Sequence, residues 1–164
     1  MEHFDDADPT RPRANKRRGR GTAANDRPPV LGTVGRQTGQ VRLRVVPNTR
    51  QTTLRSHVEQ FTREGTHVYT DEYDSYNTVS RPRSTVAHGR KEWARDDDGD
   101  GVREVHTNTI EGLWSGLRTF LRVFRGVSKH FLSGYVAIHE FRVNCKQITV
   151  AFITALVRSH YFYP

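Results

Sequence analysis

Hydrophobic and polar positions alternate near the start of the ordered chain, and a period of two predicts β-strands. Residues 30–34 are mostly apolar, 36–39 have the composition of a turn, and 41–46 alternate apolar with basic side chains. Two short strands around a glycine-containing turn are typical of a β-hairpin. We therefore expect a hairpin whose second strand carries Arg42 and Arg44 on one face and apolar residues on the other.

Farther along, the pattern predicts a helix and two more strands. An apolar stripe from Leu54 to Phe61 has helical spacing, and Gly65 is expected to close that helix. Residues 67–70 form a predicted strand that runs directly into Asp71, and residues 84–88 form another.

The last third of the chain has the period of α-helices. Apolar residues recur between Ile110 and Phe124 at the spacing of a core-facing stripe, and Gly126 is expected to end this helix. Ser128 is placed to cap the next helix, which runs through residues 132–139. Strands followed by helices predict one mixed α/β domain over residues 29–164, without an internal repeat.

The net charge of the chain indicates the kind of partner that it binds. The 164 residues hold 26 Lys and Arg against 18 Asp and Glu, a formal net charge of +8. Such an excess points to a polyanionic partner, most often nucleic acid. Residues 1–28 contain almost no large apolar side chain and are expected to form a flexible tail. The basic run in this tail, with Arg17, Arg18 and Arg20, is either a solvated arm or an arm that contacts DNA phosphates.

Composition also excludes several classes of protein. Cys145 is the single cysteine, which excludes a disulfide framework and a multi-cysteine zinc site within this chain. The acidic start lacks the apolar segment of a secretory signal. The longest apolar stretch, 148–157, is far shorter than the roughly 20 residues of a membrane helix. We expect a soluble, cytoplasmic, nucleoid-associated protein with no membrane partner.

Asp71 is the first candidate for chemistry. It ends a predicted strand, and open α/β sheets place their functional groups at the carboxyl ends of strands. An aspartate that caps a turn is the more common explanation of the same pattern. Both interpretations of Asp71 therefore stay open at the level of the residues alone.

Glu111 is the second candidate, and it too has two interpretations. Its spacing from Asn108 fits a capping box, in which the carboxylate bonds back to the cap amide. A helical wheel instead places Glu111 on the flank of the apolar stripe that also carries Arg118, Arg122 and Arg125. Such a row is either a phosphate track leading to a metal-binding carboxylate or ordinary surface salt bridging, and geometry alone favours neither.

A carboxylate from a strand end and one from a helix start are suited to Mg²⁺. This ion prefers hard oxygen ligands and supports chemistry on phosphodiesters. A two-metal site normally requires a third carboxylate. His88 and His106 are each able to orient a carboxylate or touch a phosphate, although a lone histidine is more often structural.

The acidic segment 96–101 imitates the opening of an EF-hand calcium loop. The twelfth position of that loop falls on Thr107, where a bidentate glutamate is required. No entering helix is predicted either. An acidic surface turn is therefore the favoured interpretation, and a calcium-binding module the weaker one.

Four segments resemble, in order and spacing, the ISXO-like group of bacterial and archaeal insertion-sequence transposases. They are 69–76, 86–88, 105–115 and 140–144, and the match extends from about Arg18 to Asn144. The most specific part is the run Asn-Thr-Ile-Glu-Gly-Leu-Trp-Ser at 108–115.

The resemblance implies a ribonuclease H-like fold of the retroviral-integrase type, in which helices flank a mixed sheet. It also implies an Asp-Asp-Glu triad that uses Mg²⁺ or Mn²⁺, in a two-metal site where the triad is complete, to cut and rejoin DNA. By position, Asp71 resembles the second aspartate and Glu111 the glutamate, with Asn108, His88 and Asn144 as auxiliary residues. The partners implied are element ends, target DNA and a second copy of the protein when bound to DNA.

Two departures from the family pattern matter. Family members carry the first aspartate on an initial strand, but the residues around Asp5 and Asp6 have no strand pattern. The cysteine-rich DNA-binding part common in the family does not fit a chain with one cysteine. We therefore expect either the C-terminal portion of an active transposase or a truncated copy that is a non-catalytic DNA-binding remnant.

Overall fold

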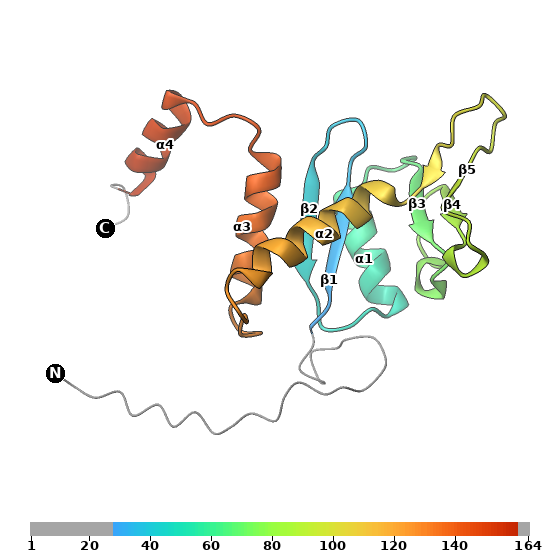
Figure 1. Cartoon of the computed structure of the whole chain (residues 1–164), viewed down its shortest axis with the longest axis horizontal. Coiled ribbons are helices and arrows are strands. Elements are labelled where there is room, and N and C mark those ends of the chain that lie inside the picture. The colour runs from blue at the N-terminus through green and yellow to red at the C-terminus, as the bar shows by residue number, and fades with distance from the viewer. Residues whose placement is uncertain (1–27, 161–164) are drawn as a thin grey trace, which may run out of the picture.

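The computed structural model describes residues 28–160, in which small sheets and helices form the expected mixed α/β arrangement (Figure 1). The predicted tail and Arg17, Arg18 and Arg20 lie outside the described residues. The elements are, in chain order, β1 (Val30–Val34), β2 (Val41–Val45), α1 (Gln51–Phe61), β3 (Val68–Asp71), η2 (Asp74–Tyr76), β4 (Arg83–Val86), η3 (His88–Arg90), β5 (Ala94–Arg95), β6 (Val105–His106), α2 (Asn108–Arg122), α3 (Leu132–Asn144) and α4 (Val150–His160).

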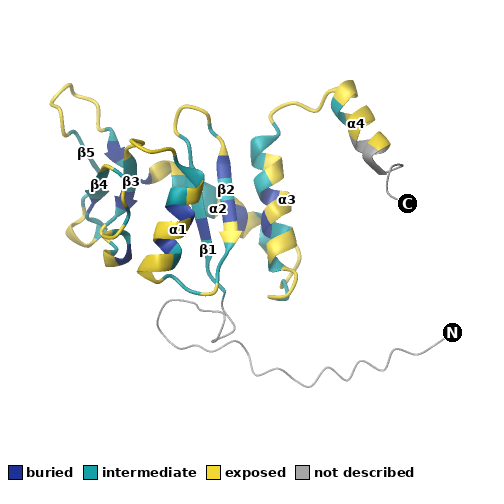
Figure 2. Cartoon of the chain, turned by 180° about the vertical axis from the view of Figure 1, so that it is seen from behind, coloured by how far each residue is buried: buried dark blue, intermediate teal, exposed yellow. Residues whose placement is uncertain are grey.

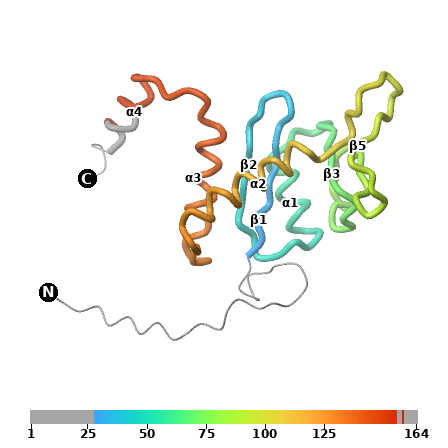
Figure 3. The backbone as a smooth tube through the Cα atoms, in the orientation of Figure 1, coloured from blue at the N-terminus to red at the C-terminus, as the bar shows by residue number. Residues whose placement is uncertain are grey.

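Within the described residues the strands pair two by two. β1 and β2 form the predicted antiparallel hairpin, with Val30 opposite Val45 and Val34 opposite Val41. β3 and β4 are parallel, whereas β5 and β6 are antiparallel. The tube in Figure 3 follows the chain from the hairpin through α1 to β3, and back along α2 to α3.

Helices cover both faces of the hairpin. Figures 1 and 2, taken from opposite sides, show α2 crossing one face and α1 lying on the other. The core on the α2 side is formed by Val41 and Leu43 of β2, Leu117 of α2 and Val136 of α3. This pattern confirms that β2 buries its valine and leucine side chains while its arginines point the other way.

Gly32 allows α2 to approach the hairpin closely. A Cβ atom at this position would lie 2.7 Å from Cη2 of Trp114, so any larger residue would clash with the indole. The glycine in the middle of β1 is therefore explained by packing against Trp114 rather than by a turn.

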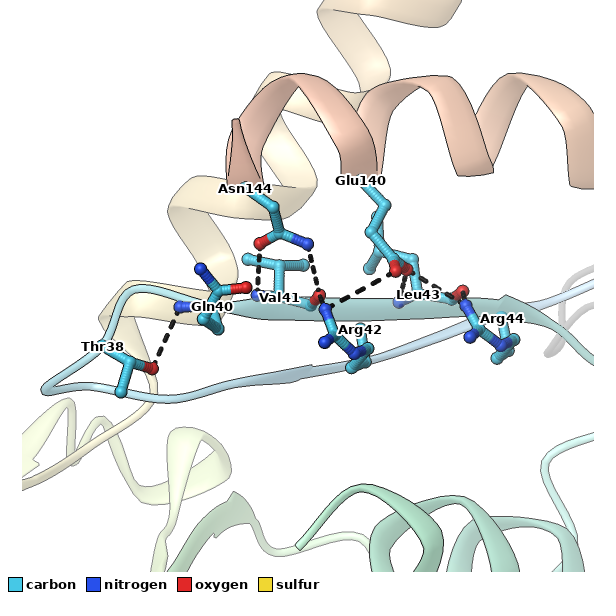
Figure 4. Close-up of polar contacts among 8 residues, drawn as sticks. All are labelled: Thr38, Gln40, Val41, Arg42, Leu43, Arg44, Glu140 and Asn144. Carbon is cyan, nitrogen blue, oxygen red and sulfur yellow. Dashed lines mark hydrogen bonds and ion pairs between the residues drawn. The ribbon is translucent and has the colours of Figure 1, made fainter. Parts of the chain in front are cut away.

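Side chains of α3 satisfy the outer edge of β2 (Figure 4). The Asn144 side-chain amide accepts from the Val41 N–H (2.7 Å) and donates to the Val41 carbonyl (2.9 Å). One turn earlier, Oε2 of Glu140 accepts from the Leu43 N–H at 2.5 Å. The spacings match, because four helical residues rise about 6 Å and two strand residues rise about 6.6 Å. The helix thus takes the place that a neighbouring strand would occupy.

Several predicted boundaries are wrong by a few residues. α1 ends at Phe61 rather than near Gly65, and the Thr62 hydroxyl donates to the Val58 carbonyl at that end. α2 ends at Arg122, so Phe124 leaves the apolar stripe and is 42% exposed. Local hydrogen bonds end both helices before Gly65 and Gly126, the glycines at which the apolar pattern predicted the helix ends.

Two further predictions of local structure are corrected. β4 ends at Val86, and His88 begins the 3₁₀ turn η3 instead of continuing the strand. Ser128 does not cap α3, because Phe131 is the residue at the N-cap and the Ser128 carbonyl accepts from its N–H in a preceding turn.

The C-terminal helix α4 lies apart from the other elements in Figure 1. Its Phe152 stacks on Phe141 of α3, with ring centroids 5.8 Å apart. In the part of the chain that the structure describes, no helix has both the length and the apolar character needed to cross a bilayer.

Two histidines are buried at helix contacts. His57 of α1 is 6% exposed, and no hydrogen-bond partner faces its Nε2. Burial, with the positive charge of Arg44, lowers the pKa of His57 to about 4, although Glu140 acts in the opposite direction. His139 of α3 is also buried, and burial together with Arg142 lowers its pKa. Both rings therefore remain neutral in the folded protein near neutral pH.

Asn144→Leu is expected to destabilise the protein by about 1–3 kcal/mol, because the Val41 N–H and carbonyl lose their partners while the volume stays similar. Urea unfolding measures the change. Gln147→Leu, which also replaces a side-chain amide with leucine but at an exposed position, is the control and should change the free energy of unfolding by less than about 0.5 kcal/mol. Equal effects of the two substitutions would contradict the role given to Asn144.

Acidification from pH 7.5 to 5 is expected to destabilise the fold through His57. The unfolded state takes up a proton near the ordinary histidine pKa of 6.5, whereas the folded state does so only near 4. The stability present above pH 6.5 is therefore lost as the pH falls toward 4, by at most about 2 kcal/mol at pH 5. Urea unfolding should show a smaller loss for His57→Leu than for the unsubstituted protein over the same pH range, and identical losses would refute this assignment.

Candidate active site

The ends of neighbouring strands bring the candidate residues to one edge of the fold. Asp71 is the last residue of β3 and lies opposite Val86, the last residue of the parallel strand β4. His88 follows Val86 by two residues, in η3. β6 packs beside these strands and leads through Thr107 into α2. Asp71 thus lies at the carboxyl end of a parallel strand, as its sequence pattern predicted.

Glu111 is held by two side chains from different segments. Its Oε1 lies 3.2 Å from Nε2 of His88 and accepts from the Thr107 hydroxyl at 3.0 Å. The same His88 nitrogen is 3.1 Å from the Thr107 hydroxyl, so the three groups form a closed triangle. The Glu111 side chain is 51% exposed and is therefore accessible from solvent while one of its oxygens is fixed.

The capping box predicted for Glu111 is wrong. α2 begins at Asn108 with Thr107 at the N-cap, and Glu111 bonds to the Thr107 hydroxyl instead of the Asn108 amide. Asn108 is exposed at the first position of the helix. The carboxylate of Glu111 is therefore oriented by His88 and Thr107 and is not used to complete a helix cap.

Asp71 caps a turn and also faces the strand-end edge. Its Oδ1 accepts from the Tyr73 N–H at 3.2 Å, which confirms the turn interpretation as one part of its role. The next residue, Glu72, accepts from the Gly89 N–H at 2.8 Å and ties the end of β3 to η3. Glu72 carries no sequence pattern that would mark it as part of the site.

Arg36 at the hairpin tip was also missed. Its guanidinium lies 3.7 Å from the centroid of the Tyr69 ring, on the strand that ends in Asp71. It also donates to the carbonyls of Glu104 and His106, on the segment that leads into α2. Arg36 therefore connects the hairpin with both candidate segments. A turn arginine gives no sequence signal for such long-range contacts.

His106 takes no part in the triangle formed around Glu111. Burial, and secondly the charge of Arg36, lower the pKa of His106. Its carbonyl accepts from Arg36, so the residue links β6 to the hairpin. Of the two histidines considered from the sequence, only His88 contacts a candidate carboxylate.

The predicted arginine row is present in part. Arg118 and Arg122 are exposed on α2, as the helical wheel requires. Arg125 lies beyond the end of that helix, in a left-handed conformation with φ of 53°, so the wheel does not place it beside the others. Asn144 is not brought to Glu111, because its amide is engaged with Val41 of β2.

The acidic segment forms a surface turn that is closed by its own backbone. The Asp96 carboxylate accepts from the N–H groups of Gly99 (2.6 Å) and Gly101 (2.9 Å), and these bonds lower the pKa of Asp96. One oxygen each of Asp96, Asp98 and Glu104 lies within 4.8 Å of the others, a spacing compatible with a cation. β5, not a helix, precedes this turn.

Comparison with known proteins places these residues in a family. A family model for the ISXO2-like transposase domain matches residues 4–144, which include Asp71, His88 and Glu111. An uncharacterized protein in transposable element ISH50 of Halobacterium salinarum is 32% identical over 138 residues, covering 82% of this chain and 45% of the relative. The chain thus spans less than half the length of that relative. The resemblance of the four sequence segments is confirmed, and the chain belongs to the ISXO2-like transposase family.

Proposed function

We propose that this chain forms the catalytic part of an insertion-sequence transposase, which cuts and rejoins DNA by metal-dependent phosphodiester hydrolysis and strand transfer. The observation that carries the proposal is the placement of two carboxylates. Asp71 ends β3 at the same edge at which His88 and Thr107 hold Glu111. Family membership supports a role in transposition.

The types of residue at this edge are suited to a divalent cation. Asp71 and Glu111 offer carboxylate oxygens, the hard ligands that Mg²⁺ and Mn²⁺ prefer. Oδ1 of Asp71 accepts from the Tyr73 N–H, and the Glu111 carboxylate is half exposed. When bound, the metal would activate the attacking oxygen and neutralise charge at the phosphate, with a second ion where the triad is complete.

The protein groups around the carboxylates have separate tasks in this proposal. His88 and Thr107 fix one oxygen of Glu111 and so limit the directions in which the other oxygen points. Arg118 and Arg122, exposed on the helix whose first turn carries Glu111, contact phosphates of the bound DNA. Arg125 and the tail residues Arg17, Arg18 and Arg20 extend this contact. Asn108 is an auxiliary residue beside Glu111, and Asn144 acts from a distance by holding α3 on the hairpin.

A ribonuclease H-like fold is part of the proposal. Among the described residues, β1 pairs only with β2 and β3 only with β4. A strand added between the remaining edges of β1 and β3 would join the two pairs into one sheet, covered by α1 and α2. We propose that the initial strand of the family, with its first aspartate, lies there. Its aspartate would then stand beside Asp71, as a two-metal site requires.

A second candidate is a non-catalytic DNA-binding remnant that acts on the same DNA. It is favoured by the lack of a strand pattern around Asp5 and Asp6 and by the net charge of +8. Both candidates have element ends and target DNA as partners, bind as homo-oligomers on DNA, and act at the nucleoid. The first candidate is catalytic and the second is not. One substitution can therefore distinguish between the two candidate functions.

Asp71→Ala in the natural full-length protein is expected to reduce strand transfer by at least ~100-fold, because a metal ligand supplies several kcal/mol of transition-state stabilisation. DNA affinity at fixed salt should change less than about twofold, since one carboxylate adds no phosphate contact. An assay of strand transfer with Mg²⁺ or Mn²⁺ and a gel-shift titration measure the two quantities. Asp74→Asn, at an exposed acid on the following turn, is the matched control and should retain transfer.

Unchanged strand transfer by Asp71→Ala would remove Asp71 from the catalytic site. Metal-dependent cleavage by the purified 164-residue chain would exclude the remnant. DNA binding without any cleavage, with an affinity that falls by a log–log slope of about −0.9 per neutralised phosphate, would favour it.

A further inference from the structure

Trp93 is unusually exposed for its size. Its side chain lies between η3 and β5 and is 59% exposed, although a tryptophan normally buries most of its surface. The chain has two tryptophans, and the other one, Trp114, packs over Gly32 in the core. Packing against the core therefore explains why position 114 is a tryptophan. Packing does not explain the exposed tryptophan at position 93.

This indole stands beside the candidate active site. The ring centroids of Trp93 and His88 are 5.1 Å apart, with the planes tilted by 45°. His88 in turn contacts Glu111 at 3.2 Å. A flat apolar surface thus begins one side chain away from the proposed metal-binding carboxylate.

Two cations precede Trp93 on the same loop. Arg90 and Lys91 are exposed, and Lys91 has φ of 62°, a left-handed conformation that residues with a side chain rarely adopt. Hydrogen bonds from the Lys91 N–H to His88 (3.0 Å) and from the Glu92 N–H to Ala87 (3.1 Å) hold this shape. Lys91 is the C-cap of η3, a position at which the left-handed conformation is common.

The nearest acidic residue on the loop, Glu92, does not repel a polyanion, because its carboxylate is paired with a cation. The Glu92 carboxylate is paired with Nη1 of Arg95 at 2.5 Å, and Arg95 also bonds Asp97. The loop therefore carries an exposed aromatic side chain, with two exposed cations close to it in sequence. Proteins bind unpaired nucleobases with this combination, because a base stacks on the ring while cations contact its phosphate.

We propose that Trp93, with Arg90 and Lys91, binds an unpaired nucleobase of the DNA at this site. The inference rests on the proposed function, because it takes DNA as the substrate of the neighbouring carboxylates. An unpaired base at a strand end has a free face, and such faces stack on exposed aromatic side chains. Trp93 provides the surface on which that base stacks.

The experiment compares two DNA ligands of equal length, a blunt duplex and a duplex with an unpaired 3′ overhang. Tryptophan fluorescence and gel-shift titrations are recorded at one salt concentration with Trp93→Leu, Trp93→Phe and the unsubstituted protein. The overhang should quench fluorescence of the unsubstituted protein and bind more tightly than the blunt duplex. Trp93→Leu should bind the overhang about 10-fold more weakly and lose the quenching, since the remaining Trp114 packs against Gly32 of the hairpin.

Trp93→Phe keeps an aromatic face and should recover most of the affinity for the overhang. Blunt-duplex affinity should stay within about twofold for all three proteins, because the phosphate contacts are unchanged. Equal overhang affinity of Trp93→Leu and the unsubstituted protein would overturn the inference. Loss of blunt and overhang binding together in both variants would also overturn it, because it would indicate a structural role for Trp93.

Failure of the proposed function would give different results from failure of the inference on Trp93. If the unsubstituted protein binds neither DNA, both the function and the inference are wrong. If Trp93→Leu loses overhang binding while Asp71→Ala retains strand transfer, the base site stands and the catalytic assignment of Asp71 is wrong. If Asp71→Ala abolishes transfer while Trp93→Leu binds like the unsubstituted protein, only the inference on Trp93 is wrong.

Discussion

The contact between α3 and the outer edge of β2 determines how the central part of this protein is assembled. Asn144 and Glu140 lie one helical turn apart and supply the hydrogen-bonding groups that a neighbouring strand would offer to Val41 and Leu43. Because the edge is satisfied, Val136 of α3 can pack against the buried side of the same strand together with Leu117. Glu140 also pairs with Arg44, so one carboxylate links the strand backbone to the basic face of the hairpin.

On the other side of the hairpin, the side chain of Arg36 likewise bonds to the backbone of a neighbouring segment. Its guanidinium donates to two carbonyls on the segment of β6 and stacks on Tyr69 of β3. A planar fork with several donors is suited to two acceptors on one strand edge. The hairpin is thereby connected to the two segments that end in Asp71 and lead into Glu111. Side chains, rather than backbone pairing, join the small sheets of the described region.

The sequence predicted most residues of the candidate site, but it did not predict the contacts that hold them in place. Asp71, His88 and Glu111 were all predicted, from strand ends, helix spacing and the resemblance to the family. The triangle of His88, Thr107 and Glu111 was not, because it joins residues from separate segments through side-chain geometry. Glu72 and Arg36 were missed for the same reason. The capping-box prediction for Glu111 failed because spacing alone could not show that Thr107, not Asn108, occupies the N-cap.

The sequence by itself determined the hairpin, the mixed α/β class, the stripe of α2 and the family, because these depend on local periodicity and on the order of short motifs. Only the tertiary structure decided where helices ended, which arginines remained on α2, and that Asn144 serves the β2 edge rather than Glu111. It also left Trp93 exposed beside His88 while packing Trp114 against the core. Local pattern cannot separate these outcomes, since each depends on which distant backbone or ring a side chain meets after folding.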